Sequence, residues 1–239
     1  MPERGVTVVT GAAQGLGRAI AVALAHDGWR VAAIDVHRAG LDALQAEVGD
    51  VIHPWAVDLP NAEATQRAIE DVQATLGEVD YLVHNAAILI EQPFAKVDFA
   101  RWQATVNVGL QAAYLLTAAV WPGMLERQRG RVIYVSSRSG IEGFANETAY
   151  CAVKHGMEGF MKALALEAEG TGVAVSTITP GMYMRTPMSE RNYPPEAKAQ
   201  WVEPSALAGA FVHLGADMNE QHNGERLNAW EMAEHPGQA

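Results

Sequence analysis

Gly5-Val6-Thr7-Val8-Val9-Thr10-Gly11-Ala12-Ala13-Gln14-Gly15-Leu16-Gly17 is the stretch that decides the fold of this chain. A short apolar run ends in a turn with three glycines, and an amphipathic stretch follows at residues 16–26. This pattern predicts a strand, a tight turn and a helix. Glycines let such a turn approach a pyrophosphate, which accepts hydrogen bonds from the free N–H groups of the helix. The spacing GxxxGxG differs from the GxGxxG fingerprint, so an ordinary glycine-rich turn is an equal alternative for this stretch taken alone.

The same alternation of short apolar runs and longer amphipathic stretches continues along the chain. Further strands are predicted at residues 30–34, 51–57, 81–84, 131–135, 173–178 and 226–228. Further helices are predicted at residues 39–48, 62–76, 99–126, 148–169 and 204–215. Strands that alternate with helices form right-handed βαβ units. We therefore predict one domain over residues 1–239 with a Rossmann-type doubly wound α/β fold, a parallel sheet of about seven strands with helices on both faces.

The segment 180–202 shows no regular pattern. It contains Pro180, Gly181, Pro187, Pro194 and Pro195. Because a long structureless stretch is usually functional, we expect residues 182–202 to form a lid over a substrate site.

Composition narrows the possible classes of function. Of 239 residues, 49% are hydrophobic and 19% are charged, which excludes a disordered chain. The net charge of -11 disfavours nucleic acid and anionic membranes as partners. The single cysteine, Cys151, excludes an internal disulfide, and the eight histidines lack zinc-ligand spacing, so we expect no metal. The N-terminus lacks a secretory pattern and no apolar stretch approaches the roughly 20 residues of a spanning helix, so we expect a cytoplasmic protein.

Asp35 ends the second predicted strand. A carboxylate at this spacing reaches the ribose hydroxyls of a dinucleotide and repels a 2′-phosphate. Taken alone, Asp35 is more often a helix cap or a turn acid, but together with the glycine turn the cofactor interpretation is favoured.

Tyr150 and Lys154 are four residues apart in a predicted helix, so their side chains share one face. A nearby cation stabilises a phenolate, which allows a tyrosine to exchange a proton with an alcohol or carbonyl. A solvated pair is the alternative for these two residues alone. Ser137 strengthens the catalytic interpretation, because it follows the predicted strand 131–135 at the edge where parallel sheets bind ligands.

With these features the chain resembles the short-chain dehydrogenase/reductase family over essentially its full length, and the step of thirteen residues from Ser137 to Tyr150 also fits that family. The matching residues occur in the family's order: Gly11, Gln14, Gly15, Leu16 and Gly17 in the turn, Asp35, then Asp58 and Leu59, Asn85 and Ala86, Asn107, Ser137, Tyr150, Lys154, and finally Pro180, Gly181 and Thr186.

The resemblance implies a role for each residue. Tyr150 is the general acid/base, Ser137 orients the substrate oxygen, and Lys154 lowers the tyrosine pKa and holds the nicotinamide ribose. Asn107 positions a water that relays protons to Lys154. The other matching residues, together with Tyr150 and Lys154, contact the dinucleotide, with Asp58 near adenine and Thr186 near the carboxamide.

Three departures from the family pattern are visible. The usual Asn-Asn-Ala-Gly is His84-Asn85-Ala86-Ala87, which loses a flexible glycine. The Pro-Gly-x-x-x-Thr motif is one residue longer here, ending at Thr186. The chain also reads Asn228-Ala229-Trp230-Glu231 where relatives often have Asp-Gly-Gly.

We therefore predict an oxidoreductase that transfers a hydride between NAD(H) and a secondary alcohol or ketone of a polar small molecule, such as a sugar, polyol or hydroxy acid. NAD is expected over NADP because Asp35 faces the ribose and Val36 replaces a cation, although Arg38 is close by. The alternatives are an NADPH-dependent 3-oxoacyl thioester reductase and a non-catalytic dinucleotide-binding regulator. The family resemblance, together with the apolar content of the helices 99–126 and 148–169, further predicts a homotetramer built on these helices and the C-terminal strand.

Overall fold

The computed structural model describes residues 4–216 and 218–234. Its centre is a seven-stranded sheet with the order β3-β2-β1-β4-β5-β6-β7, in which every neighbouring pair is parallel. The strands are β1 (Gly5–Thr10), β2 (Trp29–Asp35), β3 (Ile52–Ala56), β4 (Val79–His84), β5 (Gly130–Val135), β6 (Val173–Thr179) and β7 (Arg226–Asn228). The predicted fold class is confirmed.

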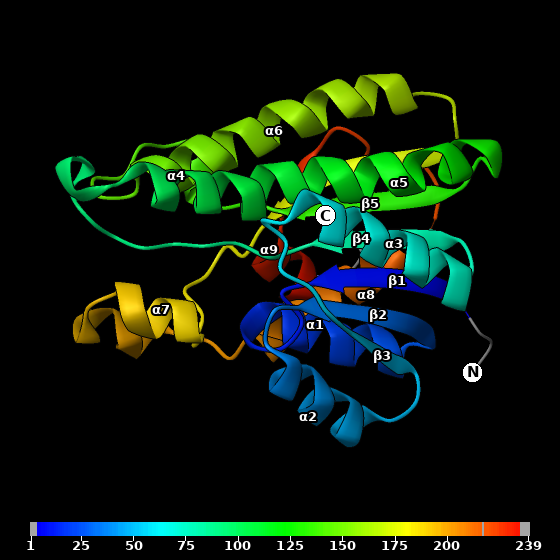
Figure 1. The fold of residues 1–239 in the computed structure, drawn as a ribbon, viewed down its shortest axis with the longest axis horizontal. Helices are drawn as coiled ribbons and strands as arrows, with labels where there is room; N and C mark the ends of the chain where they lie inside the picture. The colour runs from blue at the N-terminus through cyan, green and yellow to red at the C-terminus, as the bar shows by residue number, and fades with distance from the viewer. Residues whose placement is uncertain (1–3, 217, 235–239) are drawn as a thin grey trace.

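Helices cover both faces of this sheet (Figure 1). One layer contains α1 (Gly15–His26), α2 (Arg38–Val48), α8 (Ser205–Ala216) and α9 (Ala229–Glu234). The other contains α3 (Ala62–Leu76), α4 (Phe99–Val106), α5 (Ala112–Glu126) and α6 (Thr148–Ala168). The strand order reverses between β1 and β4, and in sheets of this kind ligands bind at the carboxyl ends of the strands beside that point.

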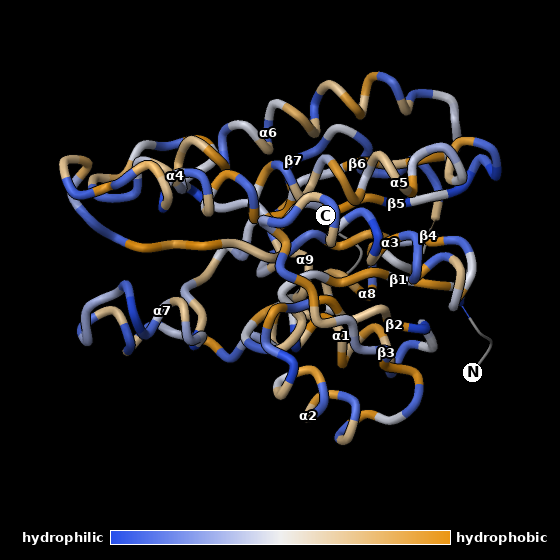
Figure 2. The backbone as a smooth tube through the Cα atoms, in the orientation of Figure 1, coloured by the Kyte–Doolittle hydropathy of each residue, from blue (hydrophilic) through white to orange (hydrophobic). Residues whose placement is uncertain are grey.

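Successive strand residues belong to different cores, because side chains alternate between the two faces of a strand. Val9 packs with Ile20 and Phe211 in the core under α1 and α8, whereas its neighbour Val8 packs with Leu116 in the core under α5. Figure 2 shows hydrophobic residues recurring along the strands and on the helices around them. Burial on both faces explains why the strands are nearly continuous apolar runs in the sequence.

The segment Phe99–Glu126 is helical throughout, as predicted, but it is not one regular α-helix. A π-helical turn, η2 (Asn107–Gln111), separates α4 from α5. By length and composition alone the 28-residue helix would suffice to cross a membrane, so the expectation that no segment reaches this length was wrong. The helix instead packs against α3, β4 and β5.

The interpretation of residues 180–202 as structureless was also wrong. The segment contains α7 (Pro187–Asn192) and a 3₁₀ helix, η4 (Pro195–Gln200), and a β-bridge joins Met184 to Val202. Thr186 caps α7 and Pro187 occupies its first turn, which are ordinary signals for a helix start. In Figure 1, α7 stands apart from the two helical layers, beyond the carboxyl ends of the strands. Its action as a lid stays a prediction.

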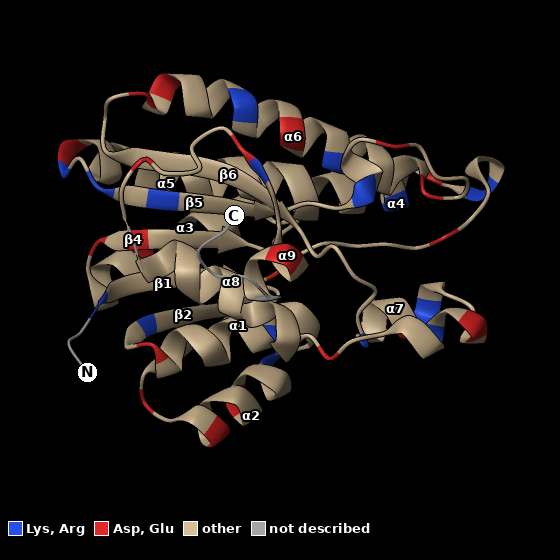
Figure 3. Cartoon of the chain, turned by 180° about the vertical axis from the view of Figure 1, so that it is seen from behind, with Lys and Arg blue, Asp and Glu red and all other residues tan. Residues whose placement is uncertain are grey.

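Charged residues are spread over several elements. In the view of Figure 3, Lys and Arg are interspersed with Asp and Glu on the described chain rather than gathered on one element.

Candidate active site

A cleft of about 470 Å³ lies at the carboxyl ends of the strands, where β1 and β4 are neighbours. The predicted cofactor-binding residues that line it are Gly11, Gln14, Gly15, Leu16, Asp35, Asp58, Leu59, Asn85, Ala86, Tyr150, Lys154, Pro180 and Thr186. The lining does not include Gly17 or Gly181. It also does not include Ser137 or Asn107, although Ser136 and Val108, the residues next to these two, do line the cleft. Most of the predicted residues therefore share one cavity.

Gly17 and Gly181 are required by packing rather than by contact with the cleft. A Cβ atom on Gly17 would lie 2.1 Å from the carbonyl oxygen of Gly11, and one on Gly181 would lie 1.9 Å from Oδ1 of Asn228. Gly181 also has a φ of +79°. The first close approach folds the turn tightly over the start of α1, where the Gln14 side chain makes no capping bond. The free N–H groups and the tight turn fit the pyrophosphate of a dinucleotide.

Asp35 holds its carboxylate in one orientation at the edge of the cleft. Oδ2 accepts a hydrogen bond from the backbone N–H of Ala13 at 3.0 Å, and Oδ1 accepts one from His37 at 2.9 Å. The first bond ties the carboxylate to the glycine turn. Arg38, the nearby cation in the sequence, is paired with Asp42 at 2.8 Å.

Tyr150 and Lys154 lie one turn apart on α6, with Lys154 Nζ 5.4 Å from the centroid of the Tyr150 ring. Lys154 is 2% exposed, and its Nζ donates to the carbonyl oxygen of Val135 at 2.6 Å. The Ser137 side chain lies close enough to Tyr150 to lower the pKa of the phenol by hydrogen bonding. The structure thus brings Ser137, Tyr150 and Lys154 together, as the sequence predicted.

Burial sets the protonation of this group. It raises the pKa of the Tyr150 phenol above its usual value, and Tyr193 acts in the same direction, while the hydrogen bond with Ser137 lowers it. Burial lowers the pKa of Lys154 to about 8, while the carboxylate of Glu158 acts to raise it. Near neutral pH the phenol therefore carries its proton and the lysine is still charged.

Asn107 begins the π-helical turn η2. This turn packs directly on α6, because a Cβ atom added to Gly109 would lie 2.3 Å from Cγ1 of Val153, the neighbour of Lys154. The structure shows this packing of η2 against α6, and the water relay predicted for Asn107 stays a prediction.

Comparison with known families matches residues 5–197 to the short chain dehydrogenases. The chain is a short-chain dehydrogenase. It is 36% identical over 225 residues to an acetoacetyl-CoA reductase of Shinella zoogloeoides, covering 89% of this chain and 91% of that one. It is 33% identical over 234 residues to a D-threitol dehydrogenase of Mycolicibacterium smegmatis, covering 93% and 90%.

Two solved structures share its fold. A putative NAD(P)-dependent gluconate 5-dehydrogenase from Beutenbergia cavernae, with NADP bound at low occupancy, has a TM-score of 0.82 at 30% identity, covering 96% of this chain and 97% of that one. A 3-ketoacyl-(acyl-carrier-protein) reductase from Brucella melitensis in complex with NADH has a TM-score of 0.88 at 25% identity, covering 95% and 96%. This short-chain dehydrogenase is therefore an NAD(P)-dependent oxidoreductase that acts on alcohol or carbonyl groups.

His84, noted in the sequence only as a departure, is a fully buried link between the glycine turn and η2. Its Nε2 lies 3.0 Å from the carbonyl oxygen of Gly109, and its Nδ1 lies 3.0 Å from the hydroxyl of Thr10. A carbonyl only accepts, so Nε2 carries the proton and Nδ1 accepts from Thr10. That hydroxyl in turn accepts from the backbone N–H groups of Asn85 and Ala86, both at 3.0 Å.

A second network that the sequence did not reveal extends from Ser137. Its hydroxyl donates to Ser139 at 3.3 Å, and the Ser139 hydroxyl donates to the Glu147 carboxylate at 2.8 Å. Glu147 is only 6% exposed, and it lines a small hollow of about 20 Å³ together with Tyr150. In residues 4–216 and 218–234 no Lys, Arg or His forms an ion pair with Glu147.

His84 should make the stability of the protein depend on acid pH. Burial, followed by the charge of Lys154, lowers the pKa of His84 from 6.5 to about 4. Between these two pKa values the unfolded chain binds the proton more tightly than the folded protein does. The stability that comes from the neutral His84 is therefore complete above pH 6.5 and is lost as pH falls towards 4. On acidification through this range, the free energy of unfolding of the wild type should fall by about 3 kcal/mol more than that of His84→Asn, measured by urea denaturation. Parallel pH profiles would contradict the buried neutral imidazole.

Proposed function

We propose that this short-chain dehydrogenase interconverts a secondary alcohol and a ketone in an uncharged polyhydroxylated substrate, with NAD(H) as cofactor. The observation that carries the substrate class is the buried carboxylate of Glu147, which forms no ion pair within the described residues and is linked through Ser139 to Ser137. The fixed carboxylate of Asp35 carries the preference for NAD(H).

The chain's own residues would handle the proton. Tyr150 gives or takes it at the phenol oxygen, Ser137 orients the substrate oxygen beside that phenol, and the Lys154 ammonium stabilises the phenolate. Asn107 would connect Lys154 to solvent. When bound, the nicotinamide supplies the hydride donor or acceptor.

Removal of the Tyr150 hydroxyl tests this assignment. Tyr150→Phe keeps the ring and its packing but has no transferable proton, so kcat should fall by about a hundredfold or more. The dissociation constant for NADH, measured by fluorescence, should stay within about threefold of the wild type. A variant that retains more than about a tenth of kcat would exclude Tyr150 as the essential acid/base. A protein with no turnover on any alcohol would instead be the non-catalytic dinucleotide-binding regulator.

The argument for NAD(H) rests on charge at the adenine end of the cleft. Asp35 is held by two backbone N–H groups, so it cannot easily turn away from a 2′-phosphate. Val36 is 68% exposed beside it and offers no positive charge. Arg38 and Arg18 are engaged by Asp42 and Glu47. A 2′-phosphate would therefore meet a fixed like charge, which commonly costs several kcal/mol.

The kcat/KM for NAD⁺ should exceed that for NADP⁺ by about tenfold or more in the wild type. Asp35→Ser combined with Val36→Arg removes the like charge and adds a cation, so the ratio should narrow or invert. Asp42→Ala is the matched control, because it frees Arg38 without changing Asp35. A wild type that uses NADP⁺ equally well, and loses that ability in Arg38→Ala, would assign control of the pocket to Arg38.

The argument for a neutral polyol rests on which groups donate and which accept hydrogen bonds in the site. An ionised carboxylate only accepts hydrogen bonds, so Glu147 suits substrate hydroxyl groups, which donate. The negative charge of Glu147 is also felt nearby, since burial and then Glu147 raise the pKa of Glu91. A hydroxy acid would be repelled here. The D-threitol dehydrogenase among the relatives acts on a neutral polyol, which supports this class.

A 3-oxoacyl thioester is the second candidate substrate. It is favoured by the names of the acetoacetyl-CoA reductase and of the 3-ketoacyl-(acyl-carrier-protein) reductase that the chain resembles. A thioester carbonyl accepts hydrogen bonds, however, and would face an acceptor at Glu147.

Glu147→Gln distinguishes these candidates. The amide can donate, so kcat/KM for the best tetritol or pentitol should fall by about tenfold to a hundredfold, and that for hydroxy acids and acetoacetyl-CoA should rise. Glu142→Gln, at an exposed site in the same loop, is the matched control. Wild-type activity is screened on polyols, hydroxy acids and 3-hydroxyacyl-CoA with NAD⁺ and NADP⁺, following the reduced nicotinamide. A strong preference of the wild type for the acyl-CoA would overturn the polyol assignment.

A further inference from the structure

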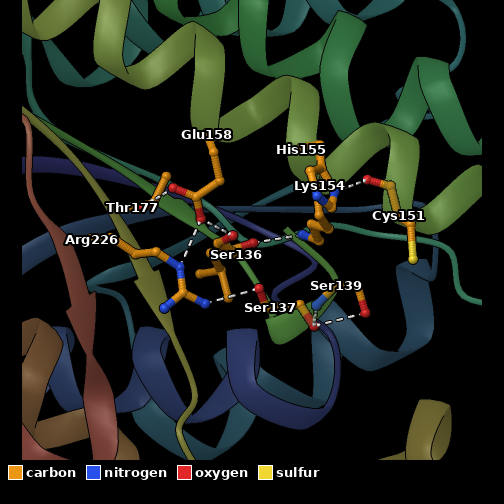
Figure 4. A network of polar contacts seen from close by, with 10 residues as sticks. Ser136, Ser137, Ser139, Cys151, Lys154, His155, Glu158, Thr177 and Arg226 are labelled. Carbon is orange, nitrogen blue, oxygen red and sulfur yellow. Dashed lines mark hydrogen bonds and ion pairs between the residues drawn. The ribbon is translucent and has the colours of Figure 1, made fainter. Parts of the chain in front are cut away.

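A largely buried ion pair lies behind Ser137 and Lys154 (Figure 4). It joins Glu158 on α6 to Arg226 on β7, with 3.2 Å between Arg226 Nε and Glu158 Oε1. The Glu158 side chain is 5% exposed and that of Arg226 is 26% exposed. Glu158 is one helical turn beyond Lys154, on the same face of α6.

The Glu158 carboxylate bonds to residues at the ends of three strands of the sheet. Its Oε1 also accepts a hydrogen bond from the Ser136 hydroxyl, and its Oε2 accepts one from the Thr177 hydroxyl at 2.8 Å. Ser136 directly follows β5, Thr177 lies in β6 and Arg226 lies in β7. One carboxylate on α6 therefore fixes the helix that carries Tyr150 and Lys154 against three adjacent strand ends.

Arg226 extends this connection to the serine of the active site. Its Nη2 donates to the backbone carbonyl oxygen of Ser137 at 3.0 Å. The neighbouring residue Val135 is held by Lys154 Nζ, and Ser136 is held by Glu158. Three consecutive residues at the end of β5 are thus each bonded to α6, directly or through Arg226.

We propose that Glu158 and Arg226 form a positioning unit for the reaction. The pair holds the Ser137 backbone in register with α6, so that the Ser137 hydroxyl stays beside the Tyr150 phenol. The proposal rests on the roles proposed above for Ser137, Tyr150 and Lys154. Arg226 acts through Ser137, and Glu158 acts through Ser136 and Arg226.

The placement of the bonds distinguishes this role from general stabilisation of the fold. A buried ion pair is a weak source of stability, because the desolvation of two charges offsets most of their attraction. An apolar pair of similar volume would fill the same space, but it could not donate to the Ser137 carbonyl. The loop after Ser137 also passes directly over the pair, since a Cβ atom on Gly140 would lie 2.8 Å from Ser136 Oγ and 3.2 Å from Glu158 Oε1.

The decisive variant replaces both charges at once. Glu158→Met combined with Arg226→Met leaves no unpaired charge, so the protein should fold with a thermal midpoint close to that of the wild type. Because Ser137 loses its anchor, kcat should fall by about tenfold to a hundredfold, while KM for the cofactor changes by less than about threefold. Glu158→Gln and Arg226→Gln should each lower kcat. When these two glutamine substitutions are combined, their effects on kcat should not add. Glu167→Gln, an exposed glutamate on the same helix, is the matched control.

Amide hydrogen exchange gives a readout that does not depend on finding the substrate. In the Met/Met variant, the amides of residues 136–140 should exchange about tenfold faster than in the wild type, while those of β1 and β2 should be unchanged. Faster exchange with an unchanged kcat would show that the ion pair anchors this segment without a role in catalysis, and would overturn the proposal. An unchanged exchange rate at residues 136–140 would also overturn it, because the segment would then not depend on the ion pair. Failure of the Tyr150→Phe prediction would instead refute the proposed function, and the exchange result would still report on the anchor.

Discussion

One hydroxyl group, that of Thr10, joins the strand before the glycine turn to the strand beside it. It bonds to the backbone of Asn85 and Ala86 and to the ring of His84, while the Asn85 amide donates back to the Thr10 carbonyl oxygen. These residues are 74 to 76 positions apart in the sequence, so local structure alone would not bring them together. The cleft opens where these two strands meet, and the position of its phosphate turn relative to η2 depends on this set of bonds.

The sheet was predictable from the sequence because its cause is local. Each strand is covered on both faces, so each is a short apolar run, and every predicted strand lies within two residues of the observed one. The site residues with a fixed place relative to a strand end or a helix turn were predictable for the same reason. Asp35 closes β2, Ser137 follows β5, and Tyr150 and Lys154 share one face of α6.

The rest depended on partners that are distant in the chain. Glu158 has the spacing of an ordinary helix residue, and nothing local indicates that Arg226, 68 positions away, will bond to it. Glu147 likewise became notable only when the structure showed it buried, with no cation paired to it in the described part of the chain. The helix α7 is a different case, because Thr186 and Pro187 gave a local start signal. The prolines around it were interpreted as breaks, although proline in the first turn favours a helix.

The π-helical turn also changes which way the two halves of the long helix face. A π turn inserts one extra residue, and each residue of an α-helix advances its direction by about 100°, so the faces of α4 and α5 are out of phase by that amount. Accordingly α5 buries a stripe that includes Leu116 and Val120, whereas α4 buries only Thr105. The buried apolar stripe that packs α5 against the sheet therefore does not determine which face α4 turns towards the sheet. Substitutions can reshape the entrance beside α4 without disturbing the core, and this rotational independence gives one scaffold room to accept differently shaped substrates.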